Sequence, residues 1–190
     1  MRFKLFTGVA VVAALLAPQS ASAQLVPTGL SCTLASVAMG ASGCIGAYNG
    51  NDTGQQADIL AKLALDFGGS WTSLGKTDDA NFGPFTSNPT NVNSGTLSFD
   101  MPRTGPFALL LKTSTEFSIY YFANAGTVSS VNFNTVGTSQ NNQGVGRDLS
   151  HARLYTGSGS MNVVPEPSTY ALMATGMIGL VGFARRRRQA

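Results

Sequence analysis

Two adjacent segments near the middle of the chain constrain the fold more than any other feature. Residues 107–112 are apolar apart from the final lysine, which suits a central strand buried on both faces. Three polar residues follow, and residues 116–122 then alternate, with Phe117, Ile119 and Tyr121 on one side. We therefore predict an antiparallel hairpin, although its connection lacks the Asn-Gly pair typical of the tightest turns.

Four more short segments have the composition of strands and are separated by turns rich in Gly, Pro and Asn. They cover residues 71–76, 95–100, 127–133 and 149–155. Many short strands with frequent turn residues are typical of an all-β sandwich or barrel. We predict a mainly β body over residues 24–162, an antiparallel β-sandwich or jelly-roll-like domain with one short helix.

The segment that begins near Asn51 or Asp52 and ends at Gly68 fits two structures. Polar residues recur every four positions, which favours an amphipathic helix ended by the glycine pair. The apolar side of that helix is expected to comprise Ala57, Leu60, Ala61 and Ala64. Alternation from Ile59 to Phe67 also fits a strand. Both interpretations remain open, and we favour the helix.

The net charge of +3 comes from the ends of the chain. Between Gln24 and Val164 there are six lysines and arginines against eight aspartates and glutamates, so the body carries a charge of about −2. It has no basic stripe interleaved with aromatic residues. Nucleic-acid binding is therefore not expected.

Residues 1–23 have the three parts of a secretory signal peptide: basic residues, an apolar stretch and an A-x-A cleavage site at Ala21 and Ala23. We expect export through the secretion translocon and cleavage by signal peptidase, so that the mature chain starts at Gln24. The alternative is an uncleaved membrane anchor, which the shortness of the apolar stretch disfavours.

The C-terminal segment, residues 163–190, combines a stiff proline motif, an uncharged stretch and a basic cluster. Pro165 and Pro167 hold Glu166 in extended backbone. Residues 168–184 carry no charge, and as a helix they would reach about 25 Å, slightly short of a hydrocarbon core of about 30 Å. We expect a marginal transmembrane helix with its basic end in the cytoplasm. That end comprises Arg185, Arg186, Arg187 and Arg188.

This order of parts resembles the PEP-CTERM sorting signal. The resemblance implies recognition by an exosortase, a membrane-embedded cysteine transpeptidase-like enzyme, through Pro165, Glu166 and Pro167. It further implies a transient inner-membrane tether, removal of the tail, and delivery to the cell surface or exopolysaccharide matrix of a Gram-negative-type bacterium. Residues 44–52, 71–76, 107–122 and 149–154 also resemble parts of uncharacterised PEP-CTERM surface proteins. An unprocessed tail anchor is the alternative.

Cys32 and Cys44 are the only cysteines. An even count in an exported chain predicts one disulfide that closes a small loop. The alternatives are two free thiols or a metal site. A metal site is disfavoured because the single histidine lies far along the chain.

His151 is the one candidate for acid–base catalysis, with Ser150 beside it. In a strand, neighbouring side chains point to opposite faces, and the chain has no G-x-S-x-G elbow. An ordinary strand histidine is therefore the favoured interpretation. A secreted hydrolase that uses His151 would need partners that the sequence does not identify, so no catalytic residue is predicted.

Two groups of residues are candidates for ligand contact. Asn49, Asn51, Asp52, Thr53, Asp78 and Asp79 carry oxygens suited to Ca²⁺. They match no EF-hand spacing, and turn formation accounts for them equally well; no cofactor or metal is expected. An aromatic platform for sugar rings could comprise Trp71, Tyr120, Tyr121 and Tyr155, although most aromatic residues of a small sandwich are core.

Together these observations predict a non-enzymatic exported protein of the cell surface or matrix, adhesive or associated with exopolysaccharide. The hydrolase and the unprocessed tail-anchored structural protein are the alternatives.

Overall fold

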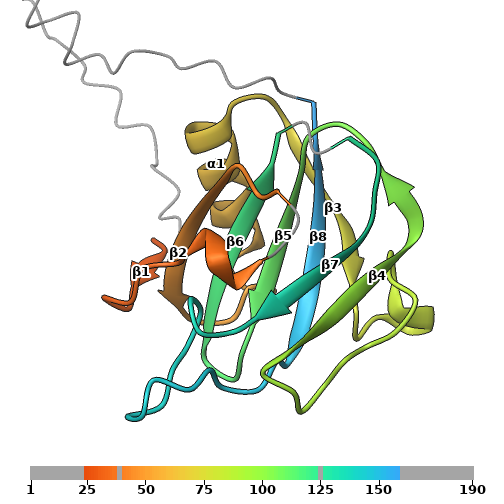
Figure 1. Ribbon diagram of the computed structural model, residues 1–190. Coiled ribbons are helices and arrows are strands. Elements are labelled where there is room, and N and C mark those ends of the chain that lie inside the picture. Colours follow the sequence, from red (N-terminus) through yellow and green to blue (C-terminus); the bar gives the residue numbers. More distant parts are fainter. Residues whose placement is uncertain (1–23, 38–39, 124–125, 159–190) are drawn as a thin grey trace, which may run out of the picture.

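The computed structural model describes residues 24–37, 40–123 and 126–158, which form three layers (Figure 1). The middle layer is a six-stranded antiparallel sheet in the order β1-β2-β6-β5-β8-β3. Its strands are β1 (Val26–Pro27), β2 (Gly43–Asn49), β6 (Glu116–Phe122), β5 (Phe107–Lys112), β8 (His151–Gly157) and β3 (Trp71–Lys76). One face is covered by a two-stranded sheet, β4 (Ser94–Arg103) and β7 (Val128–Asn134), and the other by α1 (Gln56–Phe67).

The predicted hairpin is confirmed at the centre of the large sheet. Strands β5 and β6 pair from Phe107 with Phe122 to Lys112 with Phe117. All six residues of β5 are buried, because Leu109 packs toward the two-stranded sheet and Leu110 toward the helix. The apolar run reflects burial on both faces.

The other four predicted strands are present as β3, β4, β7 and β8, with ends shifted by one to three residues except in β3. Strands β1 and β2 were not predicted. Strand β2 is composed of Gly, Cys, Ile, Ala, Tyr and Asn, and its first four residues are half-buried, so it lacks clear alternation. A register shift between Gly46 and Tyr48 also interrupts its pairing with β6.

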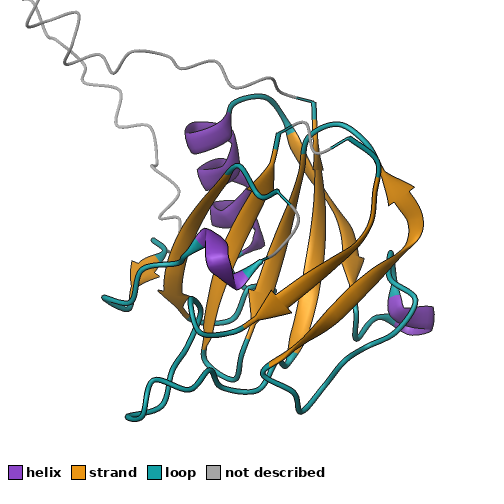
Figure 2. Ribbon diagram, in the orientation of Figure 1, coloured by secondary structure: helices purple, strands orange, loops and turns teal. Residues whose placement is uncertain are grey.

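The mainly β, antiparallel class is confirmed, but the balance of the layers differs from a jelly roll. The two sheets contain six and two strands among the described residues, and the helix takes the place of further strands on the second face (Figure 2). The core is accordingly divided by the large sheet. One half contains Leu97, Phe99, Val131 and Phe133, and the other contains the buried residues of α1.

The helix is confirmed, and it ends at Gly68, which has a positive φ of 73°. It begins at Gln56, later than expected, because residues 52–55 form a turn. The predicted apolar face was wrong in part: Ile59, Leu63 and Phe67 are buried, and Leu60 and Ala64 are half-buried against the core, whereas Ala57 and Ala61 are exposed. Residues four apart lie on one helix face, and the three large side chains bury more apolar area than the alanines would.

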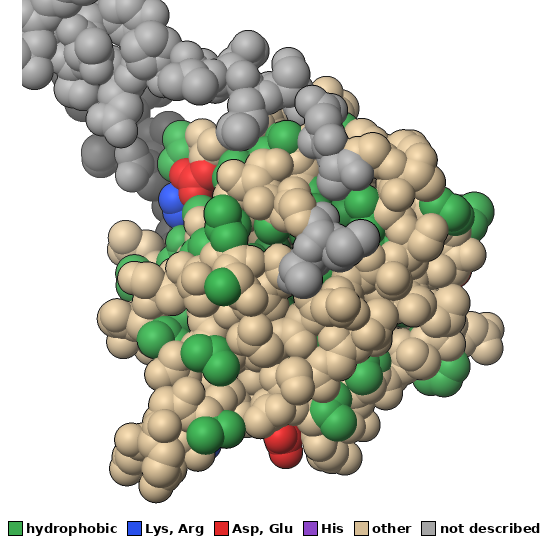
Figure 3. Space-filling view, in the orientation of Figure 1, with side chains coloured by type: hydrophobic (Ala, Val, Ile, Leu, Met, Phe, Trp, Pro, Cys, Tyr) green, Lys and Arg blue, Asp and Glu red, His purple; other side chains and the backbone are tan. Residues whose placement is uncertain are grey.

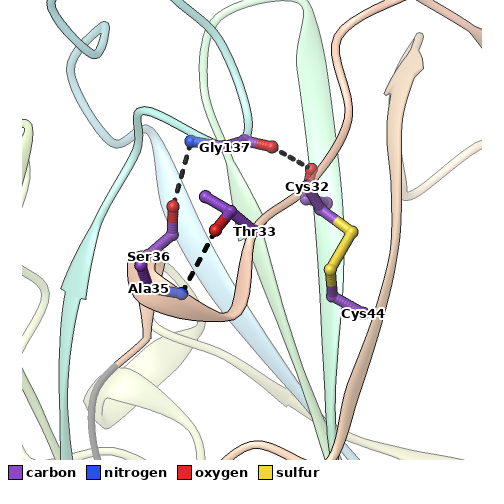
Figure 4. The surroundings of a disulfide bond; sticks show 7 residues. Cys32, Thr33, Ala35, Ser36, Cys44 and Gly137 are labelled. Atoms are coloured by element: carbon purple, nitrogen blue, oxygen red, sulfur yellow. Dashed lines mark hydrogen bonds between the residues drawn. A yellow bond between two sulfur atoms is a disulfide. The ribbon is translucent and has the colours of Figure 1, made fainter.

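The disulfide between Cys32 and Cys44 is confirmed, with the two Cα atoms 6.1 Å apart (Figure 4). It ties the segment before the short 3₁₀ helix Leu34–Ser36 to β2. Beside it, the Ser36 hydroxyl accepts a hydrogen bond of 3.0 Å from the backbone N–H of Gly137. The segment around the disulfide is thus also held to the loop after β7.

We expect replacement of both cysteines with serine to lower the free energy of unfolding by about 3 kcal/mol, since the bond closes a short loop. Urea unfolding of the mature protein, with and without reductant, measures this. Reductant should lower the free energy of unfolding of the wild-type protein by a similar amount and leave that of the double variant unchanged. Equal stability of the oxidised, reduced and substituted proteins would contradict the prediction.

Charged side chains are sparse on the face shown in Figure 3, where uncharged polar groups and isolated apolar residues dominate. This agrees with the low charged fraction of 11%. The surface of that face is therefore neutral and able to form hydrogen bonds.

Predictions for residues 1–23 and 163–190 fall outside the described residues. They concern the signal peptide with its cleavage site at Ala21 and Ala23, and the expected C-terminal transmembrane helix. Within the part of the chain that the structure describes, no helix has the length and apolar character needed to cross a membrane.

Candidate functional site

An open polar cleft of about 590 Å³ lies at one edge of the large sheet. Its position follows from the antiparallel pairing. The ends of β2, β3 and β5 and the starts of β6 and β8 all reach this edge, since Asn49 pairs with Glu116 and Lys112 with His151. The cleft is lined by Asn49, Gly50, Asn51, Thr53, Lys76, Asp78, Lys112, Ser114, Thr115, Ser150 and His151.

A buried ionic network, the Asp52 network, lies beneath the cleft. One carboxylate oxygen of Asp52 is 3.0 Å from Nε2 of His151, and the other accepts a hydrogen bond of 2.8 Å from Nε of Arg153. All three side chains are buried. His151 and Arg153 are two residues apart on β8 and therefore point to the same face of the sheet, where the turn before α1 supplies Asp52.

Asp52 is ionised at neutral pH. Burial alone raises the pKa of its carboxyl group, but hydrogen bonds and charges from His151 and Arg153 outweigh burial and hold that pKa below its ordinary value. An ionised carboxylate only accepts hydrogen bonds. The Nε2 atom of His151 must therefore carry a proton.

Arg153 extends the network to three elements. Its Nη1 atom donates to Gln56 Oε1 and Ser73 Oγ, both at 3.3 Å, and its Nη2 atom donates to Thr53 Oγ1 at 3.2 Å. These bonds link β8 to β3 and to the start of α1. Arg153 thereby positions the loop that forms one wall of the cleft.

The opposite nitrogen of His151 faces a second carboxylate. Its Nδ1 atom is 3.7 Å from Oδ2 of Asp78, and the same oxygen is 2.9 Å from Nζ of Lys76. Asp79 Oδ2 accepts a hydrogen bond of 2.8 Å from the backbone N–H of Lys76, which fixes this turn. Within the described ranges, no hydroxyl group forms a hydrogen bond with the imidazole of His151.

Lys112 lies in the cleft at the end of β5 and is only 4% exposed. Its ammonium group donates hydrogen bonds to the carbonyl oxygens of Thr113 at 2.6 Å and Ser114 at 2.9 Å. Burial lowers the pKa of Lys112, and the charges of Asp52 and Glu116 only partly oppose this. Lys112 is therefore a cation held where water solvates it poorly.

The structure places His151 in the cleft and identifies its partner, which the sequence did not. From the sequence, Asp52 is a candidate only as a source of oxygen for Ca²⁺, and neither Arg153 nor Lys112 is predicted as a site residue. A signal was present: two cationic or titratable residues at alternate positions of a buried strand require an acid. The sequence does not tell which acid.

The prediction of an aromatic platform for sugar rings is wrong. The four proposed rings are buried because they fill the two halves of the core, and none lines the cleft. They belong to Trp71, Tyr120, Tyr121 and Tyr155. Tyr121, for example, stacks on Phe67 with ring centroids 4.2 Å apart. These residues stabilise the fold in this structure and do not present a surface to a sugar.

Most of the side chains with oxygens suited to Ca²⁺ form other contacts within the described residues. The side-chain oxygen of Asn51 accepts a hydrogen bond from the backbone of Thr53, Asp52 binds His151 and Arg153, and Asp79 caps a turn. No group of three or more His, Cys, Asp or Glu side chains suited to a metal occurs in this part of the chain.

The described fold defines an antiparallel, mainly β body with a polar cleft at one sheet edge. Residues 163–188, which follow the described body, match the family described as PEP-CTERM protein-sorting motif. The resemblance to PEP-CTERM proteins is thereby confirmed, and the chain carries a sorting signal of this kind, which supports export to the cell envelope and processing by an exosortase. No curated protein and no solved structure matches the chain.

Proposed function

We propose that this is an exported surface or matrix protein whose body binds saccharides in the polar cleft after an exosortase has removed the sorting tail. The proposal depends chiefly on the composition of the cleft. Its neutral lining side chains are amides and hydroxyls, which pair well with the hydroxyl groups of a sugar. A volume of about 590 Å³ lies within the range of small-molecule sites.

The location of the cleft supports this role. The described chain ends just after Gly157, at the edge of the sheet opposite the cleft, because β8 runs from His151 in the cleft to Gly157 (Figure 1). Seven residues of extended strand cover about 23 Å. The cleft therefore lies at the far end of the body from the segment that leads to the sorting motif.

Binding is tested with the mature protein on a glycan array, followed by titration with any glycan that binds. Asn49→Ala combined with Ser150→Ala removes two hydrogen-bonding side chains from the lining and should weaken binding at least tenfold. Thr96→Ala on the separate two-stranded sheet is the control and should bind normally. Absence of binding by the wild-type protein, or equal losses in both variants, would overturn the proposed site.

Processing is tested separately. Replacement of Pro165, Glu166 and Pro167 with alanine should leave the tail attached, whereas the mature wild-type protein should lack it. Intact-mass measurement of the cellular protein, with localisation in cells with and without the exosortase, gives the result. An identical mass for both proteins, with the tail retained, would favour the unprocessed tail-anchored alternative.

A hydrolase that uses His151 is the second candidate, and the contact between Asp52 and His151 favours it. An acid that orients an imidazole is part of the Ser-His-Asp arrangement. The other imidazole nitrogen faces the carboxylate of Asp78 and not a hydroxyl group, which is why we propose a non-enzymatic role. Hydrolytic activity on glycosidic or ester substrates that His151→Ala abolishes would reverse this choice.

A further inference from the structure

Lys112 lacks a counter-ion in the part of the structure that is described. None of the ion pairs between described residues includes it. Two of its three ammonium donors are used by the carbonyl oxygens of Thr113 and Ser114. One donor therefore remains for a group in the cleft.

Among the described residues, no acid forms an ion pair with Lys112, and two acids near the cleft are paired with other side chains. Asp52 binds both His151 and Arg153 through its two oxygens. Asp78, the carboxylate that lines the cleft, is paired with Lys76. The charge of Glu116 raises the pKa of Lys112 and partly opposes the effect of burial, but Glu116 forms no ion pair with Lys112. The folded protein thus carries a buried positive charge whose loss of hydration is only partly offset.

That arrangement favours an anion in the ligand. Folding has already removed most of the water around Lys112, so an incoming anion does not have to displace a full hydration shell from the ammonium group. The interaction is also stronger here than at an exposed lysine, because the local dielectric response is weaker. Neutral hydroxyls and amides around Lys112 would bind the remainder of a polar ligand.

From this geometry, and resting on the saccharide-binding function proposed above, we infer that the cleft selects acidic saccharides and that Lys112 binds their anionic group. The anionic group is either a carboxylate, as in a uronic acid, or a sulfate, and both would bind the ammonium group of Lys112 through their charge. The role of Lys76 is different, because its charge is already matched by Asp78.

The test titrates the mature protein with three oligosaccharides of equal length: one built of galacturonate, one of sulfated galactose and one of neutral galactose. We expect at least one acidic oligomer to bind at least ten times more tightly than the neutral oligomer. The tighter of the two acidic oligomers identifies the source of the anion. Added salt should narrow the difference between acidic and neutral oligomers.

Lys112→Met removes the charge and keeps the length of the side chain. It should lower affinity for the acidic oligomer at least tenfold and lower affinity for the neutral oligomer by a much smaller factor. Lys62→Met, on the exposed surface of α1, is the matched control and should leave both affinities unchanged. Circular dichroism and urea unfolding establish that each variant is folded.

A second measurement needs no variant. Only the ammonium form of Lys112 attracts an anion, so affinity for the acidic oligomer should fall as pH rises. The fall should begin below the pH at which an ordinary lysine, with a pKa of about 10.4, loses its proton. Among the described residues, Asp52, Glu116 and His151 lie near Lys112, and Lys76 and Asp78 are further titratable groups that line the same cleft. Binding of the neutral oligomer should not follow this alkaline dependence.

The outcomes separate the two proposals. Equal binding of acidic and neutral oligomers, unchanged by Lys112→Met, overturns the role of Lys112 and leaves the saccharide function in place. Failure of all three oligomers and of the glycan array to bind overturns both. Preference for an acidic oligomer that survives Lys112→Met shows that another cation makes the contact, and this too overturns the inference.

Discussion

Replacement of Asp52 with alanine is expected to lower the free energy of unfolding by about 3–5 kcal/mol. Asp52 is fully buried and neutralises Arg153 while it fixes His151. Without it, a buried guanidinium group keeps its desolvation cost and loses its partner. Urea unfolding of the mature protein measures the change, and Asp52→Asn should show how much of it depends on charge.

Asp148→Ala is the matched control, because Asp148 is an exposed acid outside the network, and its effect should stay within about 0.5 kcal/mol. The double variant Asp52→Ala with Arg153→Met should recover part of the loss, since it removes both charges. A loss for Asp52→Ala no larger than that for Asp148→Ala would show that the network does not stabilise the fold.

The Asp52 network should also make the free energy of unfolding depend on pH in the acid range. The folded protein holds the pKa of Asp52 below its ordinary value of 3.8. The contribution of this group is therefore complete above that ordinary value and is lost as pH falls through the lower pKa of the folded state. The difference in unfolding free energy between the wild type and Asp52→Asn should shrink over that acid range.

The second large effect is expected for Phe67→Ala, which should cost about 3–5 kcal/mol. Phe67 is the last residue of α1 and stacks on Tyr121 of β6, with ring planes inclined by 12°. It also contacts Trp71 edge-on. Its loss leaves a cavity between the helix and the sheet. Urea unfolding gives the magnitude, and faster amide exchange in α1 would show that the helix has loosened.

Leu65→Ala provides the control on the same helix. Leu65 is 80% exposed and lies two residues before Phe67 on a different face. Its truncation should change stability by no more than about 0.5 kcal/mol. Equal losses at both positions would mean that the helix does not pack on the sheet through the face that Phe67 occupies.

These two effects are connected to the cleft. The turn that carries Asp52 leads directly into α1, so packing by Phe67 at one end of the helix and the Asp52 network at the other hold the same segment. That segment supplies Asn51 and Thr53 to the cleft lining. Mild destabilisation at either end should therefore weaken ligand binding before it unfolds the body.

The sequence determined the local elements of this protein. The hairpin of β5 and β6 and four further strands follow from local apolar runs, alternation and turn residues, whereas the segment that ends at Gly68 fitted both a helix and a strand by periodicity. The sorting motif from Pro165 to Arg188 is also contiguous, so reading it needs no fold. Strand β2 was not predicted because its first four residues, Gly, Cys, Ile and Gly, are all half-buried and give no clear alternation.

Only the tertiary structure decided the site. Asp52 and His151 are 99 residues apart. The body contains eight acids, and the sequence alone does not show which of them lies next to β8 in the fold. The tertiary structure likewise places the four aromatic residues of the expected platform in the core, and it buries Lys112 so that this cation is poorly solvated. Such features depend on which distant segments pack together. The arrangement of the whole sheet and its two covering layers decides this, and no local pattern in the chain predicts it.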